Sequence, residues 1–558
     1  MPDIEVPVLI VGGSLVGMST AMLLGHHGIR ARVVEHHRGT AIHPRAAMIT
    51  QRTMEVLRTV GIEQIVMQKS DEQFVQDGAI MAVETLAGKE LTYFIANLNE
   101  GVRDVSPSAR IFITQSLLEP LLKQRAEALG ADLRFATEMI SFVENRDGVT
   151  AKIRHRDTGQ EETVRARYMI AADGAHSNIR DLLGIRMLGH GVFSKSITIY
   201  FRGDVSRLLR GRSLSVMYVV NPALSGFFRI EKPFTSGFLV VHWLGNPNNP
   251  VTDVSNGLTN ERALEYLRCG LGDDSVPVEI ENIMHWDATA DTAEHFQRGR
   301  IFLAGDAAHV MPPSGGFGGN TGVQDAHNIA WKLAMVLKGQ AGPDLLATYD
   351  AERRPAAAFT VEQAYSRYVL RSAPYLKSDN MQAIANDLNI EFGYVYDSRG
   401  IIKERGNRAR VEREGVSGGG NAAAPPNENP RDSKGRPGTR APHLWIERDG
   451  RQISTLDLFD QNFTLLAGRE AEGWCHSARS AATRLGIGID IHRIGADNLS
   501  DPTATFLEAY EISSTGAVLV RPDGFVAWRA KTGEAASAGE ISDALSSVLC
   551  REVNRRSA

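Results

Sequence analysis

Apolar and polar positions at the start of the chain predict a strand, a helix and a second strand. Residues 6–11 are a short apolar run, and residues 19–27 carry helical spacing that Gly28 ends. A second apolar run then leads to Glu35. A strand–helix–strand unit of about thirty residues is typical of one half of a mononucleotide-binding fold.

Further along, the spacing of apolar positions changes twice. Four apolar runs between residues 196 and 245 are separated by Gly, Pro and Asn, which predicts an antiparallel sheet inserted between two parts of the nucleotide domain. After residue 309 the period becomes helical. The apolar face of this long helix, which Lys338 and Gly339 close, contains Val323, Ala326, Ala330, Leu333 and Leu337.

The last third of the chain begins with a polar stretch. Residues 414–440 are rich in Gly and Pro and lack periodicity, which predicts a linker or an exposed loop. Beyond it, apolar runs alternate with helical stretches, so we expect a small α/β domain there. We expect domain boundaries at 1–180 with 285–400, 181–284, a linker at 401–440, and 441–558.

A glycine-rich turn follows the first predicted strand. Gly12 permits a tight turn and Gly17 lets the helix approach the strand, but Ser14 stands where the G-x-G-x-x-G pattern has its second glycine. Glu35 ends the second strand, where a carboxylate is placed to accept bonds from ribose hydroxyls. Because strand, helix and Glu35 are in register, nucleotide binding is favoured over an ordinary tight turn.

Two other strand ends carry an aspartate beside a glycine. One is Asp173, with Arg180 following in the same stretch, and the other is Asp306. A loop with several glycines follows Asp306, and Thr321 and Gln324 have the spacing of a capping box, which predicts a helix beginning at Thr321. Its free N–H groups would stabilise negative charge on a group held in the glycine loop. The alternative is a capped surface helix after a flexible loop.

Composition narrows the class of protein. With 558 residues, 43% hydrophobic and 23% charged, the chain is typical of a multidomain globular protein. A formal charge of −5 gives no general attraction to nucleic acid or anionic membranes, and no apolar run is long enough to span a bilayer. Three scattered cysteines predict neither disulfides nor a metal site, so a reducing, cytoplasmic location is expected.

These motifs, in this order, resemble the single-component FAD-dependent aromatic hydroxylases of the para-hydroxybenzoate hydroxylase type. The resemblance extends over nearly the whole chain and is strongest to the larger members that act on phenols and aromatic polyketides. The matching stretches outside the turn and the two Asp motifs are 44–63, 114–122, 345–355, 440–450 and 516–529. It implies an α/β fold: a Rossmann-like FAD domain, an inserted antiparallel-sheet substrate domain and a C-terminal thioredoxin-like domain. No C-x-x-C pair accompanies Cys475, so that last domain is not expected to do thiol chemistry.

The resemblance also implies a set of site residues. Gly12, Gly17 and Glu35 would hold the ADP half of FAD, Arg45 and Gln115 the diphosphate and ribityl region, and Asp306 a ribityl hydroxyl. Asp173 would serve both FAD and NAD(P)H. The full set of expected FAD contacts is Gly12, Gly13, Ser14, Leu15, Val16, Gly17, Glu35, Arg45, Gln115, Asp173, Asp306, Pro313, Gly316, Gly319, Asn320 and Thr321.

The implied reaction is hydroxylation of a phenolic or polyketide-type ring with NAD(P)H and O₂ through a flavin C4a-hydroperoxide. The cofactor does the oxygen chemistry while the protein orients it and excludes water, so no acid–base pair is required and the catalytic residues stay unassigned. His309 is interpreted as structural. We expect the substrate to contact Tyr218, Phe228, Trp243 and Pro312.

Several alternatives stay open. The same flavin chemistry also serves Baeyer–Villiger oxygenation or epoxidation of a polyketide, and a degenerate nucleotide fold would be a binding protein without NAD(P)H oxidation. A flavin halogenase is disfavoured because the W-x-W-x-I-P stretch is lacking. The sequence separates neither NADPH from NADH nor a monomer from a homo-oligomer.

Overall fold

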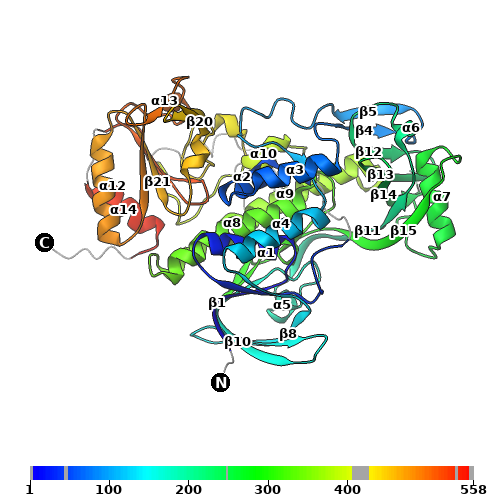
Figure 1. Cartoon of the computed structure of the whole chain (residues 1–558), viewed down its shortest axis with the longest axis horizontal. Coiled ribbons are helices and arrows are strands. Elements are labelled where there is room, and N and C mark those ends of the chain that lie inside the picture. Colours follow the sequence, from blue (N-terminus) through cyan, green and yellow to red (C-terminus); the bar gives the residue numbers. More distant parts are fainter. Residues whose placement is uncertain (1–3, 43–47, 247–248, 405–426, 534–537, 552–558) are drawn as a thin grey trace.

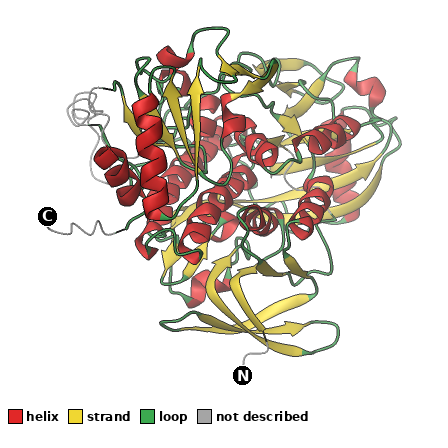
Figure 2. Cartoon of the chain, turned by 60° about the vertical axis from the view of Figure 1, so that its left-hand side comes forward, coloured by secondary structure: helices red, strands yellow, loops and turns green. Residues whose placement is uncertain are grey.

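The computed structural model describes residues 4–42, 48–246, 249–404, 427–533 and 538–551. Figure 1 shows three parts side by side along the long axis. The C-terminal domain lies at one end, a helix-rich centre carries the N-terminal sheet below it, and a second large sheet lies at the other end. In Figure 2 the N-terminal strands project away from the helices of the centre.

The first sheet is the predicted nucleotide-binding sheet. Its order is β16-β17-β10-β1-β2-β7, with β9 beside β10 and β8 beside β9. The strands β1, β2, β7, β10 and β17 run parallel. Helix α1 (Leu15–His26) connects β1 to β2, and α4 (Gln115–Ala128) leads into β7, as parallel neighbours require a crossover connection. The bounds are β1 Ile4–Val11, β2 Ala31–Val34, β7 Asp132–Arg134, β8 Thr137–Glu144, β9 Val149–His155, β10 Glu161–Ala171, β16 Gln297–Arg298 and β17 Ile301–Leu303.

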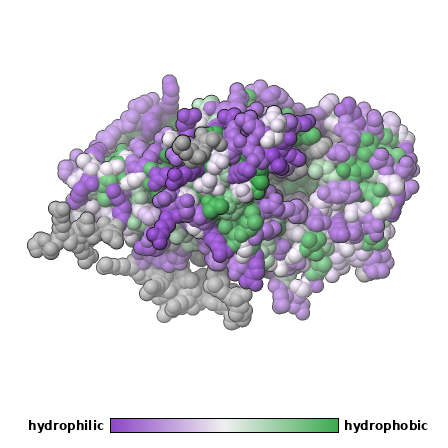
Figure 3. All heavy atoms as spheres, turned by 90° about the horizontal axis from the view of Figure 1, so that it is seen from below, coloured by the Kyte–Doolittle hydropathy of each residue, from purple (hydrophilic) through white to green (hydrophobic). Residues whose placement is uncertain are grey.

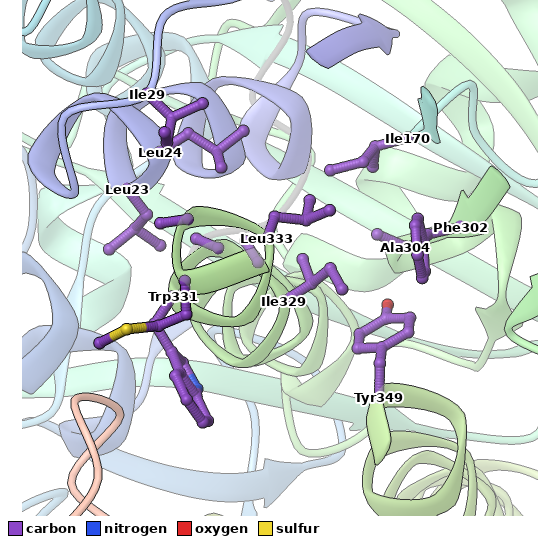
Figure 4. Packing of buried hydrophobic residues seen from close by; sticks show 14 of the residues in the cluster. Leu23, Leu24, Ile29, Ile170, Phe302, Ala304, Ile329, Trp331, Leu333 and Tyr349 are labelled. Carbon is purple, nitrogen blue, oxygen red and sulfur yellow. The ribbon is translucent and has the colours of Figure 1, made fainter. Parts of the chain in front are cut away.

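The long helix α8 (Phe317–Leu337) runs through the centre of the molecule. Residues 320–336 of α8 are all buried, not only the single face that the apolar spacing predicts. Figure 4 shows why: Leu23 and Leu24 approach it from α1, and Ile170 and Phe302 approach from the first sheet. On another side Trp331 meets Phe463 of the C-terminal domain, with ring centroids 5.8 Å apart. The neighbouring helices are α1 Leu15–His26, α2 Gln51–Thr59, α4 Gln115–Ala128 and α9 Thr348–Ser372.

The predicted start of this helix is wrong. Helix α8 begins at Phe317, with Gly316 as the N-cap residue, four residues before Thr321. The Thr321 hydroxyl donates to the Phe317 carbonyl at 2.9 Å inside the first turns, so it caps nothing. The short Gly-rich stretch after the loop is compatible with helix here because tertiary packing outweighs its low helical propensity.

The second sheet has the order β18-β15-β11-β14-β13-β12-β4-β5. Its pairs are antiparallel except that of β12 with β4. The expected insertion at 181–284 does not contain all of it, because two strands come from residues 79–95 and β15 continues to Ala293. The bounds are β4 Ala79–Val83, β5 Glu90–Ile95, β11 Met187–Arg202, β12 Leu214–Val220, β13 Leu224–Glu231, β14 Ser236–Leu244, β15 Glu279–Ala293 and β18 His309–Val310.

The two faces of this sheet have different coverings. Helix α7 (Asn260–Leu271) packs on one, which we call the outer face, over a continuous apolar core. The other, the inner face, meets two short strands of the centre, β3 (Met48–Ile49) and β6 (Ile111–Phe112), and the end of α3 (Glu63–Gln73). Side chains alternate between the faces along each strand.

The C-terminal domain has the thioredoxin-like arrangement. Its four-stranded sheet has the order β22-β21-β24-β25, with β21 and β22 parallel and the other pairs antiparallel. A separate three-stranded sheet contains β19, β20 and β23. The bounds are β19 Trp445–Arg448, β20 Arg451–Ser454, β21 Phe463–Gly468, α12 Glu472–Leu485, β22 Ile489–Ile494, β23 Leu499–Ser500, β24 Ala517–Val520, β25 Val526–Ala530 and α14 Ala538–Val548.

Part of the predicted linker is firmly packed. Within residues 427–440, Arg431 donates to both carboxylate oxygens of Asp104, and Arg440 is buried against Glu55 of α2. Residues 405–426 lie outside the described part of the chain. The segment that leads into the C-terminal domain therefore binds the centre of the molecule over its second half.

A group of buried charges, which we call the joint, ties the C-terminal domain to helices α2, α8 and α9. Glu352 accepts from Arg521 at 2.7 and 2.9 Å and from Lys332 at 2.8 Å, and all three side chains are fully buried. Each positive charge has a carboxylate in contact. The members of the joint are Arg52, Glu55, Lys332, Glu352, Arg440, Arg521 and Asp523.

The face that Figure 3 presents is mainly hydrophilic, with small hydrophobic areas. Among the described residues, no helix combines the length and the apolar character that crossing a membrane requires.

Candidate active site

The turn after β1 has the geometry that its glycines predict. Gly12 has φ +102°, and a Cβ there would lie 2.1 Å from the Ala172 carbonyl oxygen. A Cβ on Gly17 would lie 1.8 Å from the Gly12 carbonyl oxygen. The first turn of α1, at Leu15, receives no side-chain cap, so its N–H groups face the turn as an anion site requires.

Glu35 lies directly beside this turn. Its carboxylate accepts from the Gly13 backbone N–H at 2.6 Å and from the His37 N–H at 2.8 Å, and only 6% of the residue is exposed. A Cβ on Gly13 would lie 2.7 Å from the Glu35 Cβ, so the two chain segments touch. The carboxylate thus stands at the end of β2 beside the turn, as an acceptor for a ribose must.

Ser14 is held away from the turn by a residue that sequence reasoning missed. Its hydroxyl lies 2.5 Å from the Glu119 carboxylate, and the Gln115 amide donates to both at 2.6 Å. The other Glu119 oxygen accepts from the Ala41 N–H at 2.6 Å. The Ser14 departure from the glycine pattern therefore has a partner in α4. The spacing of Gln115 and Glu119, four residues apart on one helix face, is the signal that could have revealed it.

The two Asp motifs are physically joined. Asp173 accepts from the Ser177 hydroxyl at 2.6 Å, and burial raises the pKa of its carboxyl. Arg180, in the same stretch, donates to the Ala307 carbonyl at 3.3 Å, next to the exposed Asp306. One guanidinium thereby fixes the first motif against the second.

A buried carboxylate, Asp325, organises the region behind the second motif. It lies 2.7 Å from the His309 imidazole, accepts from Arg353 at 2.8 Å, and accepts from the Gly305 N–H at 3.1 Å. Burial by itself would raise its pKa, but His309 and Arg353 outweigh that and lower it. His309 is fully buried in this network, which supports its structural interpretation. Asp325 and Arg353 had no signal in the sequence, because their bonds join residues remote in the chain.

The loop before α8 approaches the centre closely. A Cβ on Gly316 (φ +67°) would lie 2.8 Å from the Met48 Cβ. Asn320 is buried, and its amide bonds the Thr50 N–H at 3.0 Å and the Met48 carbonyl at 2.9 Å. The Asn320 side chain is thus used to hold residues 48–50 against α8, so only its backbone remains for a ligand. Pro312 is buried, whereas Pro313 is exposed and Gly319 is half-buried.

The separate motifs converge at one side chain. Cβ atoms on Gly305 and Gly322 would lie 2.7 and 2.5 Å from the Val16 side chain. Strand β1, the Gly305–Asp306 stretch and helix α8 therefore meet around the start of α1. Arg45 lies outside the described residues, so its predicted role stays a prediction.

The aromatic residues expected to meet the substrate separate onto the two sheet faces. Tyr218 pairs with Phe227 across β12 and β13 and lies on the inner face. Phe228 is on the outer face, fully buried beneath α7, a position that does not favour the predicted substrate contact. Alternation explains the separation, because adjacent residues of a strand point to opposite faces. Trp243 is 1% exposed, and its indole N–H donates to the Ser372 carbonyl.

The inner face carries polar groups that the sequence did not single out. His242 is fully buried, and burial lowers its pKa to about 3, so its imidazole is neutral. Its Nε2 has no hydrogen-bond partner among the described residues, and its ring lies 5.0 Å from that of Tyr368. Burial raises the pKa of the Tyr368 phenol. Buried polar groups facing an aromatic surface are typical of a ligand pocket.

Comparison with known families agrees with this geometry. A family model for the FAD binding domain matches residues 5–364, more than half of the chain. A second model, for the C-terminal part of aromatic-ring hydroxylases, matches residues 434–551. The chain belongs to the FAD-dependent aromatic hydroxylases.

Relatives of this hydroxylase match from end to end. The 4-methyl-5-nitrocatechol 5-monooxygenase of Burkholderia sp. is 49% identical over 552 residues, which cover 99% of this chain and 98% of the relative. The tetracenomycin A2 monooxygenase-dioxygenase of Streptomyces glaucescens is 37% identical, with 98% and 97% covered. A crystal structure of aklavinone-11 hydroxylase with FAD and aklavinone is 34% identical and superimposes with a TM-score of 0.89, over 99% of this chain and all of that one.

The hydroxylase is therefore an FAD-dependent monooxygenase, with NAD(P)H as its electron donor. The described residues fit the cofactor: a turn that only glycine accommodates, an uncapped helix start and a buried carboxylate beside it. The predicted α/β architecture, with its Rossmann-like FAD domain and thioredoxin-like C-terminal domain, is confirmed.

Proposed function

We propose that this hydroxylase acts on a small phenolic ring of the nitro-substituted catechol class. The supporting observation is the 49% identity to the nitrocatechol monooxygenase over 99% of the chain, against 37% to the tetracenomycin A2 enzyme. The side chains of the inner face suit a phenolic ring, because the aromatic residues Tyr218, Phe227 and Phe238 lie on it together with the polar His242.

The side chains divide the work between cofactor and substrate. We propose that the turn at residues 12–17 and Glu35 hold the adenosine diphosphate half of FAD, while Gln115 and Asp306 hold its middle. Bound FAD, once reduced by NAD(P)H, supplies the activation of O₂ and its transfer to the ring. The loop at residues 312–319 and the start of α8 would lie along the flavin ring and favour its reduced, anionic form.

The inner face then orients the arene and excludes water. His242 is neutral and Tyr368 protonated at neutral pH, so both act on a phenol as hydrogen-bond partners rather than as charges. A dry surface protects the oxygen-transfer chemistry from loss to hydrogen peroxide.

The test is a screen of the purified yellow protein for substrate-stimulated NAD(P)H oxidation. We expect 4-nitrocatechol to stimulate it and to give an oxygenated product by mass spectrometry, with a weaker response to polyketide quinones. Gly17→Ala should abolish FAD retention, because its Cβ has no room, whereas Gly159→Ala, at an open surface turn, should retain FAD. Stimulation by polyketides alone, or ring expansion by an inserted oxygen, would contradict the proposal.

We further propose that the enzyme is cytoplasmic, on the basis of its three unpaired cysteines. A homo-oligomer stays a proposal that sedimentation would test.

A further inference from the structure

Arg229 is a buried cation on the inner face of the second sheet. It follows Phe227 by two residues on β13, so both side chains leave the strand on the same side, and it pairs with Phe238 of β14. Only 3% of the residue is exposed. Its guanidinium lies between two rings, 4.4 Å from the centroid of Phe74 and 3.9 Å from that of Phe112.

One edge of this guanidinium has no partner. Nε and Nη2 are both buried and make no hydrogen bond with any described residue. Elsewhere in this chain the same two atoms grip both oxygens of a carboxylate, as Arg186 does with Glu294 at 3.0 and 3.1 Å. Among the described residues Arg229 forms no ion pair, and the charge that acts on it is that of Glu231. The edge that elsewhere binds two oxygens therefore has no partner within the described part of the chain.

The Arg229 side chain keeps its positive charge although burying that charge is unfavourable. Burial lowers the pKa of Arg229 to about 9, partly offset by Glu231, so the group is still a cation at neutral pH. The two aromatic rings compensate part of its lost hydration through cation–π contact. A buried charge without hydrogen bonds is otherwise strongly unfavourable, and a partner that arrives with a ligand accounts for its presence.

Two contacts connect the position of Arg229 to the loop before α8. Phe112, which covers the guanidinium, pairs with Met48 across β6 and β3. Met48 in turn lies against Gly316 in the loop before α8. A ring bound between this loop and the inner face would thus have the Arg229 guanidinium on its far side, held between the rings of Phe74 and Phe112.

We propose that Arg229 binds a planar two-oxygen substituent of the aromatic substrate, a nitro or carboxylate group, through Nε and Nη2. Such a group presents two coplanar oxygens, which match the parallel N–H pair of a guanidinium edge. The inference rests on the proposed function, since it assumes that a small phenol occupies the inner face. It makes Arg229 the residue that selects substituted catechols over catechol itself.

The experiment compares ligand affinity in the FAD-loaded enzyme by flavin absorbance titration. The probes are 4-nitrocatechol, 3,4-dihydroxybenzoate and catechol. Arg229→Met should weaken binding of the recognised probe at least tenfold and leave that of catechol within twofold. Arg229→Lys should restore only part of the loss, because an ammonium keeps the charge without the planar N–H pair. The matched control is Arg202→Met on β11, whose exposed side chain pairs with Glu281 and should change no affinity.

Each outcome has a definite reading. A loss confined to 4-nitrocatechol assigns a nitro group, a loss confined to 3,4-dihydroxybenzoate assigns a carboxylate, and losses in both but not in catechol assign the shared chemistry. Equal losses for all three probes, or none, overturn the proposal. FAD content and thermal midpoint of each variant report folding. If wild-type enzyme oxidises NAD(P)H with 4-nitrocatechol while Arg229→Met keeps full affinity, only the role of Arg229 fails; if no phenol stimulates the wild type, the proposed function fails with it.

Discussion

The joint and the inner face both bury charged and polar side chains, but they treat them in opposite ways. At the joint, Arg521 contacts Glu352 and Asp523, and these carboxylates keep its pKa well above the ordinary value despite its burial. On the inner face, Arg229 lies between the rings of Phe74 and Phe112 without an ion pair to any described residue, and burial lowers its pKa to about 9. His242 on the same face also lacks a partner at Nε2 among the described residues.

This difference separates structural from functional burial. An ion network in which every cation contacts a carboxylate fixes two domains in one arrangement. A buried charged or polar group without a partner lowers the stability of the fold. Proteins retain such groups where binding or catalysis requires them. Substitutions at the joint should therefore lower the free energy of unfolding, whereas substitutions on the inner face should lower the affinity for the substrate.

The largest expected effect is at the joint. Glu352→Gln leaves Arg521 with Asp523 alone and removes the carboxylate that pairs with the buried Lys332, and breaking such a network costs about 3–5 kcal/mol. The measurement is the free energy of unfolding in urea. Arg354→Gln on the same helix is the control, because its half-exposed pair with Asp350 should contribute less than about 1 kcal/mol. Equal losses in the two variants would remove the distinction between the regions.

A second effect, on the inner face, depends on pH. His242 has a folded-state pKa of about 3, below its unfolded value of 6.5, so the unfolded chain binds the extra proton first as the pH falls. Stability should therefore decrease below pH 6.5, by about 2 kcal/mol between pH 7 and 5 from this residue. His242→Gln should flatten that part of the profile. His476→Gln, at an exposed position, should leave the profile as it is. Superimposable profiles for wild type and His242→Gln would be inconsistent with a buried neutral imidazole.

The two faces of the sheet can be compared with one pair of variants. Phe228→Leu on the outer face should cost about 1 kcal/mol of stability and leave KM unchanged, because the residue only fills the core beneath α7. Phe227→Leu on the inner face should raise KM for the phenol instead. Steady-state kinetics and urea unfolding of both variants give the answer. A rise in KM for Phe228→Leu would return that residue to the pocket.

The smallest effect has the opposite sign. Arg229→Met removes an uncompensated charge, so we expect stability unchanged or higher by up to about 1 kcal/mol. Thermal unfolding of the FAD-loaded variant measures it, at the same pH as the affinity experiment. A loss of several kcal/mol would mean that Arg229 is structural after all, like Arg521.

Local patterns predicted the parts of the molecule that depend on neighbours in sequence. The βαβ unit, the strand ends at Asp173 and Asp306 and the small α/β domain at the end of the chain all follow from periodicity and turn residues, whereas its thioredoxin-like character was implied only by the family resemblance. The start of α8 was misplaced because a four-residue capping signal competes with packing that no local pattern records.

Long-range contacts escaped prediction for a physical reason. The bond of Ser14 to Glu119 and the network around Asp325 join residues about a hundred and about twenty positions apart, respectively, and only the fold brings them together. The sequence also did not reveal which of Phe227 and Phe228 lies on the inner face. Alternation along the strand predicts that Phe227 and Phe228 point to opposite faces of the sheet. Only the position of α7 shows which of these faces is the outer one.

The pairing of β4 with β12 has a consequence for exchanging specificity between relatives. Residues 79–95 supply two strands of the sheet whose other strands lie between residues 187 and 310. A chimera that takes only residues 187–310 from a relative would combine the relative's β11–β15 and β18 with this chain's own β4 and β5. Side chains that did not evolve together would then meet where β4 pairs with β12. To exchange substrate preference between members of this family, both segments, residues 79–95 and 187–310, should therefore be transferred together.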